Sequence, residues 1–393
     1  MCVCKIGIRN NLYYPLMLIV CISLRKIDEI IINLSCEYNK SFFITPLLIF
    51  ISQFFAGFIP IFNSEKKKTS QKNSIYSGIE LIKNESTINQ PDNEMKIYIL
   101  IIFASFFNYI GVIVRKNNND SHFENKVRGI QIIFSALLCY FTIRIKIYKH
   151  QLFSLIVIFI ILIIILSMDF SENRNTNDFF KNYGLGIFSC LSRTFLDTIE
   201  KYLFEFDYLN PYKVLMLEGL IGCLLLPILF ITNKTTEDFN EFFGKEAWRL
   251  ALLIILSLIY LILSLFKNVY RVLTIKSYSP MTRALAESII DPFDFIYLFI
   301  NRKKIYNLKN NNILNNIFYF IVIFICLLIT SFLSFVYNDF IVLYCCGLEY
   351  NTHLEIQKRS ILYENINGSI MDFENNIIDE EETNNRNEEL TIK

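Results

Sequence analysis

One stretch without a single charged side chain, QLFSLIVIFIILIIILSM, occupies residues 151–168. A helix that crosses a bilayer needs about 20 mostly apolar residues. Backbone polar groups in lipid must bond within their own segment or within a closed barrel, so a run of this length predicts a membrane-spanning helix. Comparable apolar runs occupy residues 42–62, 96–114, 128–145, 210–232, 248–268 and 314–337.

Three weaker spans complete the predicted set, at residues 12–33, 182–203 and 280–300. Each contains several ionisable residues, yet each lies where a further crossing keeps the connecting loops short. The chain is 53% hydrophobic and only 19% charged, whereas soluble domains are about 25% charged. The sequence therefore predicts an all-α membrane protein with about ten transmembrane helices.

Composition and motifs exclude several functions. The net charge of +1 gives no electrostatic basis for binding nucleic acid. The three His residues lack a metal-binding or catalytic spacing, and the chain has no H-E-x-x-H, G-x-S-x-G or Walker sequence. The ten Cys residues form no pair of C-x-x-C motifs. We therefore expect no enzyme activity, no metal site and no cofactor.

Two spans share a pattern of residues at a constant displacement. The second span reads FFITPLLIFISQFFAGFIP and the seventh reads DYLNPYKVLMLEGLIGCLLLP. Pro46, Gln53 and Gly57 of the second span recur in the seventh as Pro211, Glu218 and Gly222, each 165 positions later. In addition, Asn108 and Asn268 correspond in the third and eighth spans, and Arg128 and Arg283 correspond in the fourth and ninth. A repeat of five spans enters the membrane the other way up in its second copy, and inverted repeats are typical of secondary transporters.

This pattern divides the chain into two predicted five-helix repeats, residues 1–168 and 180–340. The first contains a polar loop at 63–95. The tail at 350–393 ends in the acidic sequence DEEETNNRNEEL and is predicted to be disordered.

Three stretches resemble one family of membrane proteins: RGIQIIFSALLCYF at 128–141, TIEKYLFEFDYLNPYKVLMLEGLIG at 198–222, and NVYRVLTIKSYSPMTRALAES at 268–288. They are similar to the drug/metabolite transporter superfamily, specifically the F-type branch of the solute carrier 35 family. The likeness covers residues 12–340, although Gln53 stands where relatives often have an acid. The resemblance implies a ten-helix carrier of a small-molecule solute with both termini cytosolic. It places the carrier in an endomembrane such as the Golgi, the endoplasmic reticulum or a vacuole or lysosome-like organelle, and it leaves a homodimer open.

Charged residues inside the expected spans are candidates for the solute site. A charge in hydrocarbon costs from about 2.5 kcal/mol to far more, so such groups face the protein interior or a wet cavity. Arg193 and Asp197 lie four residues apart on one stripe of the sixth span. They could line a solute path or form a structural ion-pair stripe. For Glu200 and Lys201, near the expected end of that span, we favour the structural interpretation.

Arg128 and Arg283 each open a predicted helix and correspond in the two repeats. The guanidinium group of Arg forms bidentate hydrogen bonds with phosphate or carboxylate groups, which favours anion binding or gating. The alternative is that each Arg anchors its helix at the membrane surface or closes a gate by a salt bridge. Glu287 lies four residues after Arg283, so these two can neutralise each other, and Asp291 precedes Pro292.

Glu218 is an acid well inside an apolar span, which indicates either proton coupling or a hydrogen bond to a neighbouring helix. Asn108, Asn268 and Gln53 could bind solute or join helices.

The preferred hypothesis is a secondary-active carrier, similar to nucleotide-sugar transporters, that moves a small polar or anionic metabolite by alternating access. The alternative is a multi-pass scaffold or receptor of carrier ancestry that transports nothing.

Overall fold

A computed structural model of the chain describes residues 4–6, 13–35, 44–60, 94–117, 121–144, 147–172, 176–232, 247–297, 313–338 and 341–343, together with 352, 355 and 359. The predicted polar loop at 63–95 lies outside these residues except for its last two positions. The predicted disordered tail lies outside them except for three isolated residues.

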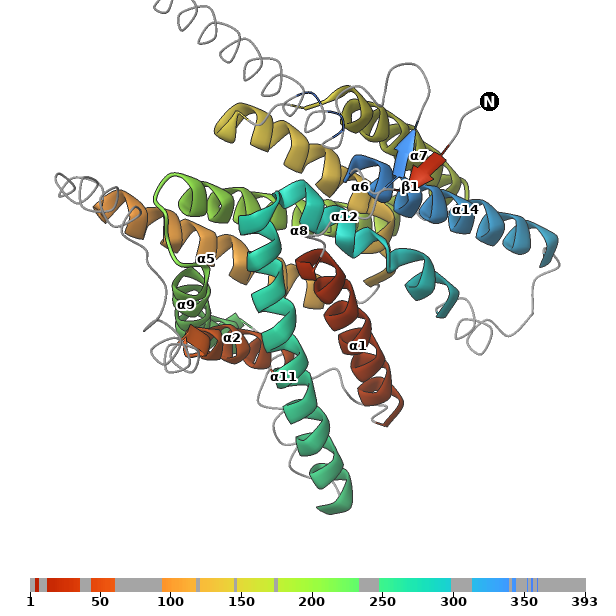
Figure 1. Cartoon of the computed structure of the whole chain (residues 1–393). Helices are drawn as coiled ribbons and strands as arrows, with labels where there is room; N and C mark the ends of the chain where they lie inside the picture. Colours follow the sequence, from red (N-terminus) through yellow and green to blue (C-terminus); the bar gives the residue numbers. More distant parts are fainter. Residues whose placement is uncertain are drawn as a thin grey trace, which may run out of the picture. The chain divides into compact units, whose positions relative to one another are not determined.

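The described part of the chain is predominantly helical (Figure 1). The helices are α1 (Tyr13–Ser35), α2 (Ile44–Ala56), α5 (Glu94–Asn117), α6 (Ser121–Leu138), α7 (Lys149–Glu172), α8 (Thr176–Glu205), α9 (Pro211–Thr232), α11 (Ala247–Ser277), α12 (Pro280–Ser288) and α14 (Ile313–Tyr337). A single π-helical turn, η2 (Cys139–Ile143), continues α6. Residues 291–297 are also helical.

Six helices in the described ranges are long and apolar enough to cross a membrane. The spans are Met95–Val114, Lys126–Ile143, Lys149–Phe170, Pro211–Ile228, Leu250–Ser277 and Phe318–Tyr337. Their outward faces are apolar, and on α11 residues Ile255, Leu258 and Ile262 are all more than half exposed. An apolar surface of this extent is typical of a lipid-facing helix. The structure therefore confirms a helical, multi-pass integral membrane protein.

The chain divides into two compact units. The larger consists of residues 9–147 and 154–334. Within it, α5 packs against α8 and α9, α11 packs against α1 and α2, α2 packs against α9, and α12 packs against α6 and α1. A core of small and aliphatic side chains forms between these helices, around Ala56, Leu203, Leu215 and Val272.

The crossing of α2 and α9 depends on glycine. A Cβ atom built at Gly219 would lie 2.6 Å from the carbonyl oxygen of Phe50, closer than van der Waals contact allows. At Gly222 the same atom would overlap the ring of Phe50. Small residues let two helix backbones approach closely in a membrane, and this approach brings Gln53 and Glu218 into the same layer.

Two predicted spans have different limits in the structure. The span expected at 280–300 is not one straight helix, because α12 ends at Ser288, a turn follows, and the helix resumes at 291. Pro292 lacks a backbone N–H donor, which accounts for a break at this place. The eighth span was expected to end at 268, whereas α11 continues to Ser277. A charged residue lowers the hydropathy of a segment, but the helix can continue past it when the charged side chain faces the protein interior.

The smaller unit consists of residues 1–8, 148–153 and 335–393. In it, strand β1 (Cys4–Ile6) pairs antiparallel with β2 (Ile341–Leu343), and Cys4 lies opposite Leu343. The prediction of a purely α-helical chain did not include this short sheet. Hydropathy patterns for helices give no signal for three-residue strands that pair over more than 300 positions.

Candidate functional site

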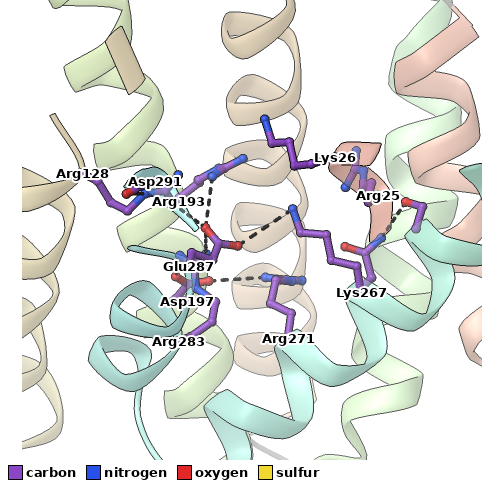
Figure 2. Close-up of polar contacts among 12 residues, drawn as sticks. Arg25, Lys26, Arg128, Arg193, Asp197, Lys267, Arg271, Arg283, Glu287 and Asp291 are labelled. Carbon is purple, nitrogen blue, oxygen red and sulfur yellow. Dashed lines mark hydrogen bonds and ion pairs between the residues drawn. The ribbon is translucent and has the colours of Figure 1, made fainter. Parts of the chain in front are cut away.

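Ten ionisable side chains in the larger unit form one connected set of ion pairs, the buried charge network. Its members are Arg128, Arg193, Asp197, Glu200, Glu218, Lys267, Arg271, Arg283, Glu287 and Asp291. All are buried except Arg193, whose side chain is 15% exposed. Figure 2 shows eight of them converging from neighbouring helices. Five are cations and five are acids.

Glu287 of α12 is the first centre of this network. The Oε2 atom of its carboxylate forms ion pairs with the Nη1 atoms of Arg128, at 2.8 Å, and of Arg283, at 3.0 Å. Arg193 of α8 approaches it to 3.5 Å and Lys267 of α11 to 3.9 Å (Figure 2). One carboxylate therefore contacts cations from four helices. The predicted pairing of Arg283 with Glu287 is present.

Arg128 and Arg283, which were predicted to be equivalent, meet on this same carboxylate. Arg128 also donates to Asp291 at 2.7 Å, and Arg283 also donates to Asp197. The two arginines are only 7% and 2% exposed. Their guanidinium groups are thus held by acids inside the protein, rather than reaching the membrane surface as helix anchors.

Arg271 of α11 is the second centre. It donates to both oxygens of Glu200, at 2.7 and 3.0 Å, which is the bidentate fork that Arg forms with carboxylates. It also contacts Asp197 and Glu218, each at 3.4 Å. Three acids from α8 and α9 therefore surround one guanidinium group.

Sequence reasoning missed Arg271 because the eighth span was ended at 268, and it passed over Lys267, which lies inside that span. Their spacing of four residues was the signal that could have found them, since it places both on one face of a helix. Glu200 was assigned to a structural stripe near the end of the sixth span. In the structure it is completely buried and forms an ion pair with Arg271 of α11, so it belongs to the network.

The predicted amide residues lie beside the network and join helices. Asn108 of α5 donates to Gln53 of α2 at 2.9 Å and to Glu218 of α9 at 3.5 Å. Asn268 instead donates to the hydroxyl groups of Ser52 and Ser264, at 3.3 and 3.4 Å. Gln53, Asn108 and Glu218 therefore form one polar layer, and Asn268 belongs to a separate set of contacts.

Other charged residues have local partners. Lys201 pairs with Glu205 at 2.9 Å and donates to the backbone carbonyl of Lys276, so it is part of a structural stripe. Arg25 donates to the hydroxyl group of Tyr260 and lies 4.7 Å from the centre of that ring. Lys126 pairs with Asp169 at 2.8 Å.

Within the described ranges, no group of three or more His, Cys, Asp or Glu side chains is arranged to hold a metal ion. The arginine-rich network instead offers guanidinium forks, which bind carboxylate or phosphate groups. No protein-family model matches the chain, and no curated protein matches it.

Proposed function

We propose that this protein is a secondary-active carrier of the drug/metabolite transporter type, resembling solute carrier 35 proteins of the F-type branch. It moves a small polar or anionic metabolite across an endomembrane by alternating access. The observation that carries this proposal is the buried charge network. Helices from both predicted repeats supply it, and ionisable groups at membrane depth mark solute pathways in membrane proteins.

The helix contacts support the repeat. Exchanging each helix for its predicted counterpart replaces α5 by α11, α1 by α8, α2 by α9 and α6 by α12. The contact of α5 with α8 then becomes that of α11 with α1, and the contact of α5 with α9 becomes that of α11 with α2. The α2–α9 and α6–α12 contacts map onto themselves. Two related five-helix units produce such a pattern.

The short sheet supports an even number of crossings. Strands β1 and β2 pair with each other, and one precedes α1 while the other follows α14. A sheet with open edges does not exist in hydrocarbon, so both strands lie in water on the same side. Ten crossings satisfy this condition when α1, α2, α8 and the helical part of 280–300 are added to the six apolar helices.

The network explains how a solute could drive alternating access. Each guanidinium group in it is held by an acid of another helix, and the pairs of Arg128 with Glu287 and Asp291 join the two predicted repeats. An anionic solute offers the same type of ligand and competes with those acids. Replacing an internal pair by a solute contact therefore loosens the helices on one side, and the bistable arrangement can reopen on the other.

The proposal is tested by counterflow with purified protein in liposomes. The vesicles are loaded with a panel of nucleotide sugars, nucleoside monophosphates and carboxylates, and the uptake of each labelled compound is measured. We expect accumulation of at least one panel member. Glu287→Gln should reduce its rate by about tenfold or more, because four cations lose their shared partner.

The control is Lys213→Gln, which removes a charge at an exposed position of α9 and should leave the rate unchanged. If no panel member accumulates while the protein is folded and correctly inserted, the scaffold or receptor alternative replaces the carrier.

A further inference from the structure

Among the five acids of the network, Glu218 has the weakest set of hydrogen-bond donors. Its Oε2 atom accepts only long contacts, from Asn108 at 3.5 Å and Arg271 at 3.4 Å. Its Oε1 atom is buried and has no hydrogen-bond donor among the described residues. Glu200, by contrast, holds both oxygens on Arg271. Both side chains are 0% exposed, so bulk solvent does not reach them.

Asp197, Glu200 and Glu218 converge on the guanidinium group of Arg271. Glu200 holds both of its oxygens on that group, at 2.7 and 3.0 Å, whereas Glu218 reaches it with one oxygen at 3.4 Å. A buried carboxylate is stable in its ionised form only when it is paired and hydrogen-bonded. Of these acids, Glu218 therefore has the contacts of a protonated group.

The surroundings of Glu218 supply no second cation. From α8 it faces Asp197 and Glu200, from α11 Arg271, and from α5 the neutral amide of Asn108. The sequence of α2 contains no ionisable residue, and its nearest polar group is the amide of Gln53. Arg271 is thus the one cation within contact distance of three acids, and Asp197 draws on Arg283 as well.

We propose that Glu218 holds a proton in the buried charge network and that this proton is the ion the carrier couples to its solute. The coupling role rests on the proposed function, whereas the protonation does not. The proton enters from water on one side, binds at the carboxyl group of Glu218, and returns to water on the other side when the network opens and Arg271 can pair with the ionised Glu218.

The protonation of Glu218 also determines which solute charge the network favours. When Glu218 is neutral, the ten groups of the network carry one net positive charge, because five cations face four ionised acids. Binding a solute with one negative charge restores neutrality in a medium where unbalanced charge is costly. Proton and anion therefore stabilise each other's binding, and an anion is the class of solute that the site favours.

Three matched variants test the protonation through stability, without any solute. Glu218→Gln replaces a neutral, donating group by another and should leave the melting temperature in detergent nearly unchanged. Glu200→Gln removes the ionised partner of Arg271 and should lower it by several degrees. Lys213→Gln, at an exposed position of α9, is the control and should have no effect. Failure of Glu218→Gln to fold, or a loss as large as that of Glu200→Gln, would show that Glu218 is ionised.

Infrared difference spectroscopy on the protein in lipid provides a direct readout. A protonated carboxyl group has a carbonyl stretching band that shifts in heavy water, and a carboxylate lacks this band. We expect the band in the wild type at neutral pH and in Glu205→Gln, and we expect its loss in Glu218→Gln. A spectrum without the band, or one in which Glu218→Gln leaves it intact, overturns the assignment.

Coupling is tested with liposomes that contain a trapped pH-sensitive dye and receive the panel mixture used for counterflow. The wild type should acidify the lumen as solute enters. Glu218→Gln should move no protons, whereas Lys213→Gln, at an exposed position of α9, should acidify the lumen as the wild type does. Counterflow without acidification in the wild type refutes coupling. Absence of counterflow refutes the carrier, while the infrared result still decides whether Glu218 is protonated.

Discussion

At the scale of single residues, each charged side chain in the interior depends on its ion-pair partner for charge compensation. Arg283 is among the largest fully buried side chains of the described chain, and its guanidinium group contacts both Asp197 and Glu287. Removing one member of a buried pair leaves the other uncompensated, which costs more than the pair itself contributes. The stability of the fold and the state of the site therefore depend on the same side chains.

This leads to a prediction for Arg283→Gln. The variant should lose about 3–5 kcal/mol of stability, because Asp197 keeps its charge without its nearest cation. The double variant Arg283→Gln with Asp197→Asn should recover part of that loss. Unfolding in detergent micelles measures both. The control is Lys276→Gln, at an exposed position in the last turn of α11. Equal stability of Arg283→Gln and the control would contradict the prediction.

At the scale of secondary-structure elements, the contact of α2 with α9 sets the position of the polar layer. Its close approach depends on Gly219, which faces the backbone of α2 rather than a movable side chain. An added methyl group must therefore separate two helices that hold Gln53 and Glu218 together through Asn108.

Gly219→Ala should accordingly destabilise the protein by about 1–3 kcal/mol, as overpacking does in other tight interfaces. Gly184→Ala is the matched control, because a Cβ atom there meets nothing within 4 Å and lies on an exposed part of α8. It should be neutral or add up to about 1 kcal/mol through helix propensity. Thermal unfolding of the two variants compares them directly, and similar values would show that the helices are not closely fitted at Gly219.

At the scale of the whole molecule, the pairing of β1 with β2 relates the two ends of the chain. In sequence β1 precedes α1 and β2 follows α14, and their hydrogen bonds require that both strands lie on one side of the membrane.

A reporter fused before Met1 and another fused after Lys393 should therefore be accessible from the same side. Protease protection in sealed vesicles, read with antibodies against each reporter, measures this. A reporter inserted in the polar segment 63–95, which two crossings separate from the N-terminus in the predicted topology, should share that side. Protection of one terminus and cleavage of the other would mean an odd number of crossings.

The sequence by itself determined the helical membrane class, because apolar runs of spanning length have no other stable structure in lipid. It also determined contacts within one turn, such as Arg283 with Glu287, since residues four apart share a helix face. It identified Arg128, Asp197 and Glu218 as candidate site residues, because hydrocarbon does not tolerate isolated charge.

Only the tertiary structure decided which charges meet. The pairing of Arg128 with Asp291 and the contacts of three acids with Arg271 join residues of different helices. Their distances depend on helix rotation, on the crossing at Gly219 and on the extension of α11 to Ser277. Local periodicity determines which face of a helix carries a charged residue. The packing of helices against one another determines which residue pairs with it, and hydropathy does not predict that pairing.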